Sequence, residues 1–137
     1  MIVVDTSVLV DFFRGKPTEG TAALDRLESD AIPFSIPVVC CQELLAGALN
    51  AAEWDLLVTY LESQHLIWPA DPWRTHSEAA RIMYDCRARG ITLRSSVDCL
   101  IAQLTLENDG VLLHSDRDFD RVAEVRPLRT WPHQFPR

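Results

Sequence analysis

The sequence predicts an α/β fold in which parallel strands lie between layers of helices. Short apolar runs, such as residues 2–4 and 111–113, alternate along the chain with longer stretches of helical period. Strands separated by helices are joined by crossovers, which make neighbouring strands parallel. The length of 137 residues is that of one domain, so we expect residues 1–137 to form a single domain.

Local signals place the ends of these elements. Thr6 or Ser7 is suited to begin the first helix and Gly15 to end it. Pro33 is expected to be the first residue of the second strand or to lie in a bulge, and Gly90 suits the end of the longest helix. The predicted strands cover residues 2–4, 32–36, 65–68, 111–113 and 125–131. The predicted helices cover residues 6–13, 22–27, 38–49, 53–62, 73–89, 95–106 and 117–122. The tail from about residue 132 is expected to be loosely held.

Composition excludes several classes of protein. The chain is 47% hydrophobic and 24% charged, which is too apolar for intrinsic disorder. No apolar run approaches the roughly 18 residues that span a bilayer, and Asp5 follows the start too closely for a secretory signal. We therefore expect a cytoplasmic protein without a membrane segment.

Cysteine spacing and net charge narrow the kinds of site. The four cysteines, at positions 40, 41, 86 and 99, include no C-x-x-C pair, so we expect reduced thiols and no structural zinc. The net charge of -7 speaks against passive binding of nucleic acid, which normally uses a basic domain. It is compatible with a site in which carboxylates hold metal ions.

Four acids stand where surface acids are not usually found. Asp5 and Asp116 lie just past strand ends, and either could serve the following helix as a cap or a first-turn acid. Asp98 lies in the opening turn of a helix and could complete a capping box with Ser95. Glu43 has apolar or small helical neighbours, which predicts that a positive group meets its carboxylate.

Together, these four acids predict a metal centre. In parallel α/β sheets, ligands bind outside the carboxyl ends of the strands, and all four positions belong to that edge. Carboxylates that converge raise one another's pKa values, and divalent cations relieve the repulsion. Oxygen ligands suit Mg²⁺ or Mn²⁺.

Four segments that contain these acids resemble the motifs of PIN domains, and most closely those of VapC-type toxins. They occur in the same order as in that family and cover nearly the whole chain. The segments are Asp5-Thr6-Ser7-Val8-Leu9-Val10-Asp11, Gln42-Glu43-Leu44-Leu45-Ala46-Gly47, Ser96-Val97-Asp98-Cys99-Leu100-Ile101-Ala102 and Ser115-Asp116-Arg117-Asp118-Phe119.

The resemblance implies a three-layer α/β/α sandwich, with five parallel strands in the order 3-2-1-4-5, and a metal-dependent ribonuclease. The implied acidic quartet, both catalytic and metal-binding, consists of Asp5, Glu43, Asp98 and Asp116. The cofactor would be Mg²⁺, with Mn²⁺ as a possible substitute. The implied accessory residues are Thr6, Ser7, Ser115 and Asp118. Of these, Thr6 or Ser7 would orient Asp5 through a hydroxyl.

The expected reaction is hydrolysis of an RNA phosphodiester bond. Metal ions bind the phosphoryl oxygens and lower the pKa of a bound water, which attacks in line. We expect a 5′-phosphate, a 3′-hydroxyl and no covalent intermediate. The candidate RNA-binding residues are Arg14, Lys16, Arg94 and Arg117.

Two alternatives remain open. A phosphatase of the haloacid dehalogenase type would need an acid where this chain has Ser7 and a lysine in a later motif, but Lys16 is the only lysine. A PIN-like module without catalysis would only bind a partner. Metal-dependent cleavage of RNA separates the three hypotheses.

The resemblance also implies partners. A VapC-type protein is inhibited by a VapB-type antitoxin that presents a basic side chain to the acids, and the net charge of -7 agrees with such a partner. The stretch from Val38 to Leu61 is more apolar than one small core needs. We therefore expect a homodimer within a larger toxin–antitoxin assembly.

Overall fold

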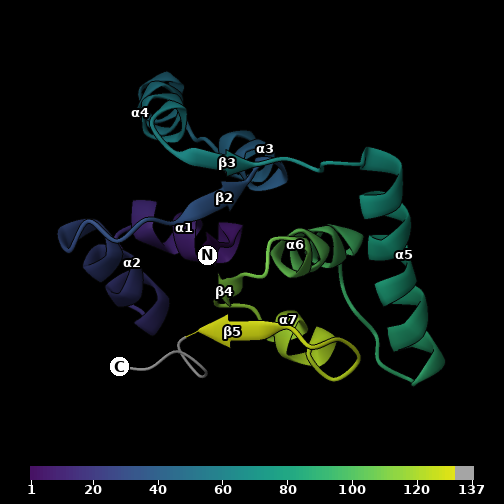
Figure 1. Cartoon of the computed structure of the whole chain (residues 1–137). Helices are drawn as coiled ribbons and strands as arrows, with labels where there is room; N and C mark the ends of the chain where they lie inside the picture. The colour runs from purple at the N-terminus through teal and green to yellow at the C-terminus, as the bar shows by residue number, and fades with distance from the viewer. Residues whose placement is uncertain (132–137) are drawn as a thin grey trace.

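The computed structural model describes residues 1–131, in which a parallel sheet is enclosed by helices (Figure 1). The strands are β1 (Ile2–Val4), β2 (Ser35–Pro37), β3 (His65–Ile67), β4 (Val111–Leu113) and β5 (Arg129–Trp131). They lie in the order β3-β2-β1-β4-β5, and every neighbouring pair is parallel. The predicted α/β sandwich and its strand order are confirmed. The tail predicted to be loosely held lies outside the described residues.

Helices connect the strands and cover both faces of the sheet. They are α1 (Thr6–Phe13), α2 (Glu19–Ser29), α3 (Val38–Ala46), α4 (Ala51–Glu62), α5 (Pro72–Ala88), α6 (Ser96–Glu107) and α7 (Arg117–Val122). Figure 1 shows α1 and α2 on one side of the sheet and α5, α6 and α7 on the other. Strands covered on both faces carry continuous apolar runs, and Val3, Val4, Leu112 and Leu113 are indeed fully buried.

Three helices begin at polar caps near the carboxyl edge of the central strands. Asp5 caps α1, Ser95 caps α6 and Asp116 caps α7, each by accepting a hydrogen bond from a backbone N–H two residues later. The Ser95 hydroxyl bonds the N–H of Val97. The turns that lead into these helices therefore place Asp5, Asp98 and Asp116 at one edge of the sheet.

The second strand and the helix after it begin or end at residues other than those predicted. Pro33 lies before β2 and is neither its first residue nor part of a bulge, while Pro37 is its last residue, where a missing N–H removes little pairing. Helix α3 ends at Ala46, three residues earlier than predicted. The reason is Asn50, whose extended backbone and side-chain bond to Glu53 N begin α4.

The predicted bounds of α2 and β5 are also corrected. Helix α2 begins at Glu19 because Thr18 and Thr21 form a reciprocal cap. Strand β5 begins only at Arg129, since Val125 and Arg126 bond back to Val122 in the turns that follow α7.

The prediction that the cysteines are reduced thiols is confirmed. All four cysteines are free thiols, and Cys41 is the one that is not fully buried. Trp131 belongs to the core, whereas Trp54, Trp68 and Trp73 are exposed. In the described part of the chain, no helix is both long and apolar enough to cross a membrane.

Candidate active site

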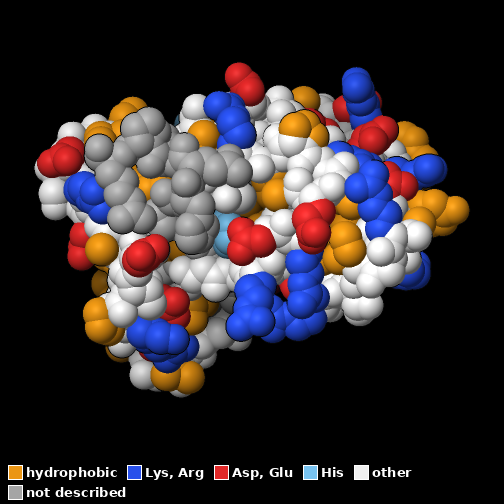
Figure 2. All heavy atoms as spheres, turned by 90° about the horizontal axis from the view of Figure 1, so that it is seen from below, with side chains coloured by type: hydrophobic (Ala, Val, Ile, Leu, Met, Phe, Trp, Pro, Cys, Tyr) orange, Lys and Arg blue, Asp and Glu red, His pale blue; other side chains and the backbone are white. Residues whose placement is uncertain are grey.

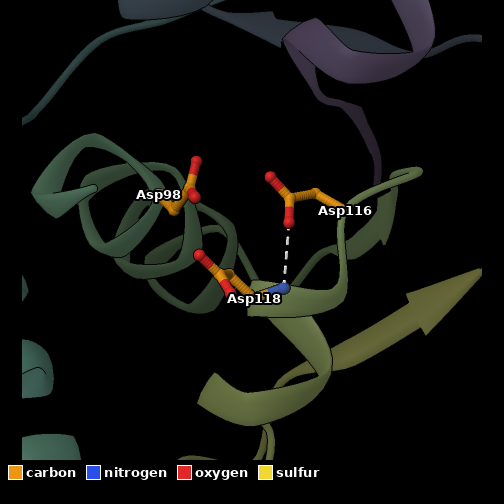
Figure 3. Close-up of side chains that lie close together, drawn as sticks. All are labelled: Asp98, Asp116 and Asp118. Atoms are coloured by element: carbon orange, nitrogen blue, oxygen red, sulfur yellow. Dashed lines mark hydrogen bonds between the residues drawn. The ribbon is translucent and has the colours of Figure 1, made fainter. Parts of the chain in front are cut away.

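Asp98, Asp116 and Asp118 form the tightest group of acids in the described residues. One carboxylate oxygen from each lies within 4.8 Å of the others. Figure 3 shows the three side chains around a common space, with Asp98 on α6, Asp116 on the turn after β4 and Asp118 on α7. Asp118, predicted as an accessory residue, is thus part of this group, while Asp5 and Glu43 are not.

The turn between β4 and α7 holds Asp116 in place. Asp116 Oδ1 accepts a hydrogen bond from Asp118 N at 3.0 Å, and Asp116 N donates to Nδ1 of His114 at 3.1 Å. His114 is buried and its ring lies 5.0 Å from that of Phe119. His114 is therefore a positioning residue for Asp116. The sequence signal for this role is a histidine two residues before a strand-end acid.

Asp5 is almost completely buried and is oriented by Ser7. Asp5 Oδ2 accepts hydrogen bonds from the N and Oγ of Ser7, at 3.0 and 2.5 Å. Ser7 Oγ in turn accepts one from Ser115 N at 3.0 Å. The other oxygen of Asp5, Oδ1, is buried without a hydrogen-bond partner among the described residues. Such an oxygen lowers stability unless a proton or a cation meets it.

Glu43 is the exposed acid of the predicted quartet and is held by Thr6. It is exposed, no Lys or Arg of the described chain pairs with it, and its Oε1 accepts a hydrogen bond from Thr6 Oγ1 at 2.7 Å. Its small neighbours do not shield it from solvent, because Ala46 and Gly47 are themselves exposed. The two predicted hydroxyls thus have separate roles, Ser7 toward Asp5 and Thr6 toward Glu43.

The capping box that Asp98 could have completed at the start of α6 is absent from the described hydrogen bonds. Ser95 bonds Val97 N, and the Asp98 carboxylate does not bond back to Ser95 N. Asp98 instead belongs to the group with Asp116 and Asp118.

Burial and mutual repulsion raise the pKa values of two acids. Burial is the larger cause of the rise of the Asp98 pKa to about 7. The negative charges that raise it further are those of Asp5, Asp116, Asp118 and Glu43. Burial also raises the pKa of Asp5 to about 6, although its bonds from Ser7 act in the opposite direction. We refer to these five acids, Asp5, Glu43, Asp98, Asp116 and Asp118, as the acid cluster.

Arg94 neutralises one side of the acid cluster. Its Nη2 donates to Asp116 Oδ1 at 2.8 Å, and its Nε donates to Asp118 Oδ2 at 3.3 Å. The backbone N of Arg94 also donates to Asp118 Oδ2, at 3.0 Å. Asp118 is buried and therefore ties the loop before α6 to α7.

The chemistry of the acid cluster fits a divalent cation. Three carboxylate oxygens converge within 4.8 Å, and Asp5 Oδ1 is buried and unpartnered among the described residues. Among the described residues, the Arg94 side chain forms ion pairs only with Asp116 and Asp118, so it does not balance the charge of Asp5 or Asp98. All-carboxylate oxygen donors suit Mg²⁺ or Mn²⁺, and neither histidine nor cysteine belongs to the group.

The structure separates the four predicted RNA-binding residues. Arg94 and Arg117 line a cavity that also contains Asp116 and Asp118. Arg14 instead donates to Gly47 O at 3.2 Å, and Lys16 lines a different cavity beside α1 and α2.

Comparisons with known proteins agree with this fold. Residues 2–125 match the PIN domain. The chain is 32% identical over 133 residues to the VapC ribonuclease Mb1587 of Mycobacterium bovis and to ribonuclease VapC11 of Mycobacterium tuberculosis. Both alignments cover 94% of this chain and 96% of the relative.

Solved structures of low sequence identity share the fold. VapBC2 from Rickettsia felis, bound to a promoter DNA fragment, has a TM-score of 0.70 at 17% identity and covers 95% of this chain and 97% of its own. VapBC-1 from nontypeable Haemophilus influenzae has a TM-score of 0.67 at 17% identity, and the match covers 95% of this chain and 96% of that chain. With the family match over residues 2–125 and the relatives at 32% identity, the chain belongs to the PIN-domain family, and within it to the VapC-type proteins.

Proposed function

We propose that this chain is a metal-dependent endoribonuclease and the toxin of a VapBC-type toxin–antitoxin pair. The observation that carries the proposal is the convergence of three carboxylates within 4.8 Å beside the buried Asp5. The relatives at 32% identity, which are named VapC ribonucleases, support RNA as the substrate. The alternative of a PIN-like module without catalysis has no comparable support. Such a module would not need the acids of the quartet, and all four are present.

The acid cluster supplies the ligands. Asp98 and Asp116 would hold Mg²⁺ or Mn²⁺ together with Asp5, whose Oδ1 has no other partner in the described chain. Asp118 would border the same site while its Oδ2 accepts from Arg94. A bound divalent cation supplies Lewis-acid chemistry, because it neutralises phosphoryl oxygens and lowers the pKa of water.

The remaining groups position these acids and move protons. Ser7 keeps Asp5 in one orientation, and His114 holds the backbone of Asp116. Glu43 is the exposed member of the cluster, and Thr6 holds its Oε1. Its carboxylate is therefore the group that we assign to accept the proton which the attacking water loses. The expected products carry a 5′-phosphate and a 3′-hydroxyl.

Cleavage of total RNA by the antitoxin-free protein tests this function. We expect cutting with Mg²⁺ or Mn²⁺, no cutting with EDTA, and a loss of at least about 100-fold in Asp98→Asn and Asp116→Asn. The matched control is Asp109→Asn, which makes the same change at a fully exposed side chain paired with Arg129. Cleavage that survives both EDTA and the two cluster substitutions, or that leaves a 2′,3′-cyclic phosphate, would exclude the mechanism.

We also propose a VapB-type antitoxin as partner and a homodimer as the basic unit, acting in the cytoplasm. The solved neighbours are VapBC complexes, which supports the first part. Exposed apolar side chains at and near α4, namely Leu49, Trp54 and Leu56, support the second. Light scattering on the purified chain is expected to give twice the monomer mass, and a monomer at micromolar concentration would contradict the dimer.

A further inference from the structure

A polar cavity of about 500 Å³ adjoins the acid cluster. Arg94, Arg117 and Arg121 line it, and it shares Asp116 and Asp118 with the acid cluster. Figure 2 views the face that carries α7 and β5 and shows a group of Lys and Arg side chains there, next to Asp and Glu side chains. The whole chain has a net charge of -7. The lining of this cavity is instead slightly positive, because its three arginines outnumber Asp116 and Asp118.

Two of these arginines have donors that the described chain does not use. The side chain of Arg117 is exposed and forms no hydrogen bond or ion pair with any described residue. Arg121 donates through Nη1 to Thr92 O at 2.9 Å, and the same atom lies 3.8 Å from Asp118 Oδ1. Because a guanidinium carries five N–H donors, both side chains retain donors for an anion in the cavity.

Arg94 connects the cavity to the acid cluster. Its side chain is 73% exposed although Nη2 and Nε contact Asp116 and Asp118. Its remaining N–H groups make no hydrogen bond within residues 1–131. A cation held by the acids would compete with Arg94 for these carboxylates, and the planar guanidinium would then be available to pair with phosphate.

We propose that this cavity binds a phosphate group of the RNA strand, next to the phosphodiester that is cleaved, with Arg94, Arg117 and Arg121 as donors. The inference rests on the proposed ribonuclease function. A strand whose scissile phosphate reaches the acids brings its neighbouring phosphate close by, and an acidic chain would otherwise repel it. The shared lining residue Asp116 places the two sites side by side. The hydroxyl-bearing Ser115 adds a neutral polar group to the same wall.

The salt dependence of RNA binding tests the assignment. Fluorescence anisotropy of the full chain with a single-stranded RNA oligonucleotide is measured in EDTA, where the proposed reaction does not proceed. Each lost phosphate contact should lower the slope of log affinity against log salt by about 0.7. We expect that reduction in Arg117→Ala and in Arg121→Ala, and a reduction of about 1.4 in the variant that lacks both, because without a cation Arg94 stays paired with Asp116 and Asp118.

Three controls separate the phosphate site from other effects. Arg81→Ala removes an exposed arginine that pairs with Asp85 on α5, outside the cavity, and should leave the slope unchanged. Arg94→Lys keeps the charge and should keep the slope, which distinguishes loss of charge from loss of the loop's structure. Mn²⁺ affinity without RNA should be unchanged in Arg117→Ala, because the Arg117 side chain contacts no carboxylate oxygen of the acid cluster in the described structure.

The outcomes separate this inference from the function on which it rests. Wild-type slopes in all three alanine variants, or no binding of RNA by the wild-type chain, would overturn the phosphate site. Inorganic phosphate that displaces the RNA at equal phosphate concentration would identify a free-anion site and reject RNA as the occupant. Reduced slopes in a chain that never cleaves RNA would leave the phosphate site standing and reject the ribonuclease.

Discussion

Ser7 Oγ donates a hydrogen bond to Asp5 Oδ2 at 2.5 Å and accepts one from Ser115 N at 3.0 Å. One hydroxyl thereby connects the turn after β1 to the turn after β4. Because Ser7 occupies Oδ2, the oxygen that stays buried and unpartnered within the described residues is Oδ1 of Asp5. The turn therefore directs which oxygen of Asp5 is available to a cation.

Removing this hydroxyl should affect both stability and pH dependence. We expect Ser7→Ala to lower the free energy of unfolding by about 1–2 kcal/mol, because Ser115 N loses its acceptor and Asp5 loses a donor. The pKa of Asp5 should rise further, since the bonds from Ser7 lower it. Urea unfolding measures the first effect, and the cleavage rate against pH, shifted to higher pH, measures the second.

Thr6→Ala is the matched control for Ser7→Ala. It removes the neighbouring hydroxyl, whose partner Glu43 is exposed and keeps its contact with water. Stability should therefore fall by no more than about 0.5 kcal/mol. Equal losses in the two variants would contradict the role assigned to Ser7.

The cation-free protein should become less stable as the pH rises from about 4 to about 7. The pKa values of Asp5 and Asp98 are about 6 and about 7 in the folded chain, above the ordinary 3.8. Between these values the folded state binds more protons than the unfolded state, so the free energy of unfolding decreases with pH. We expect a fall on the order of 2 kcal/mol, reduced by solvent around the half-buried Asp98.

Thermal melts in EDTA across this pH range measure the effect. Asp98→Asn should flatten the dependence because it removes the group with the higher pKa. In excess Mg²⁺, stability should instead increase with pH, since deprotonated carboxylates bind the cation and binding stabilises the folded state. A pH dependence that is unchanged in Asp98→Asn would show that other groups cause it.

His114 should matter for metal affinity although it is not among the ligands. We expect His114→Ala to weaken Mn²⁺ binding by about 10-fold, because Asp116 N loses its acceptor and the turn loses its packing on Phe119. Calorimetric titration with Mn²⁺ measures this. His76→Ala, at an exposed position on α5, is the control. Unchanged affinity in His114→Ala would remove His114 as a positioning residue.

Asp118 should be less critical for cleavage than Asp98, because Asp118 also binds Arg94 and Asp98 does not. Its Oδ2 already accepts two hydrogen bonds from Arg94, so part of its role is to hold the loop before α6. We expect Asp118→Asn to reduce metal-dependent cleavage by about 10- to 100-fold, less than Asp98→Asn. A loss equal to that of Asp98→Asn, with Arg94 still in place by crystallography, would assign Asp118 as a full ligand.

The order of the elements follows from local properties of the sequence. Runs such as Ile2–Val4 and Val111–Leu113 are recognisable because strands buried on both faces are apolar throughout. Element ends were predicted less well where a cap decided them, as Asn50 does by starting α4 and thereby ending α3. The cap acts through one side-chain hydrogen bond, and the spacing of apolar residues gives no information about that bond.

The sequence by itself determined where the acids of the site lie, because Asp5, Asp98 and Asp116 stand at strand ends and helix starts that a parallel sheet brings to one edge. Only the tertiary structure decided which partners these acids have. Ser7 meets Ser115 across 108 residues of sequence, and Arg94 meets Asp118 across 24. Such contacts depend on how separate turns pack and how side chains rotate, and neither spacing nor charge pattern along the chain specifies them.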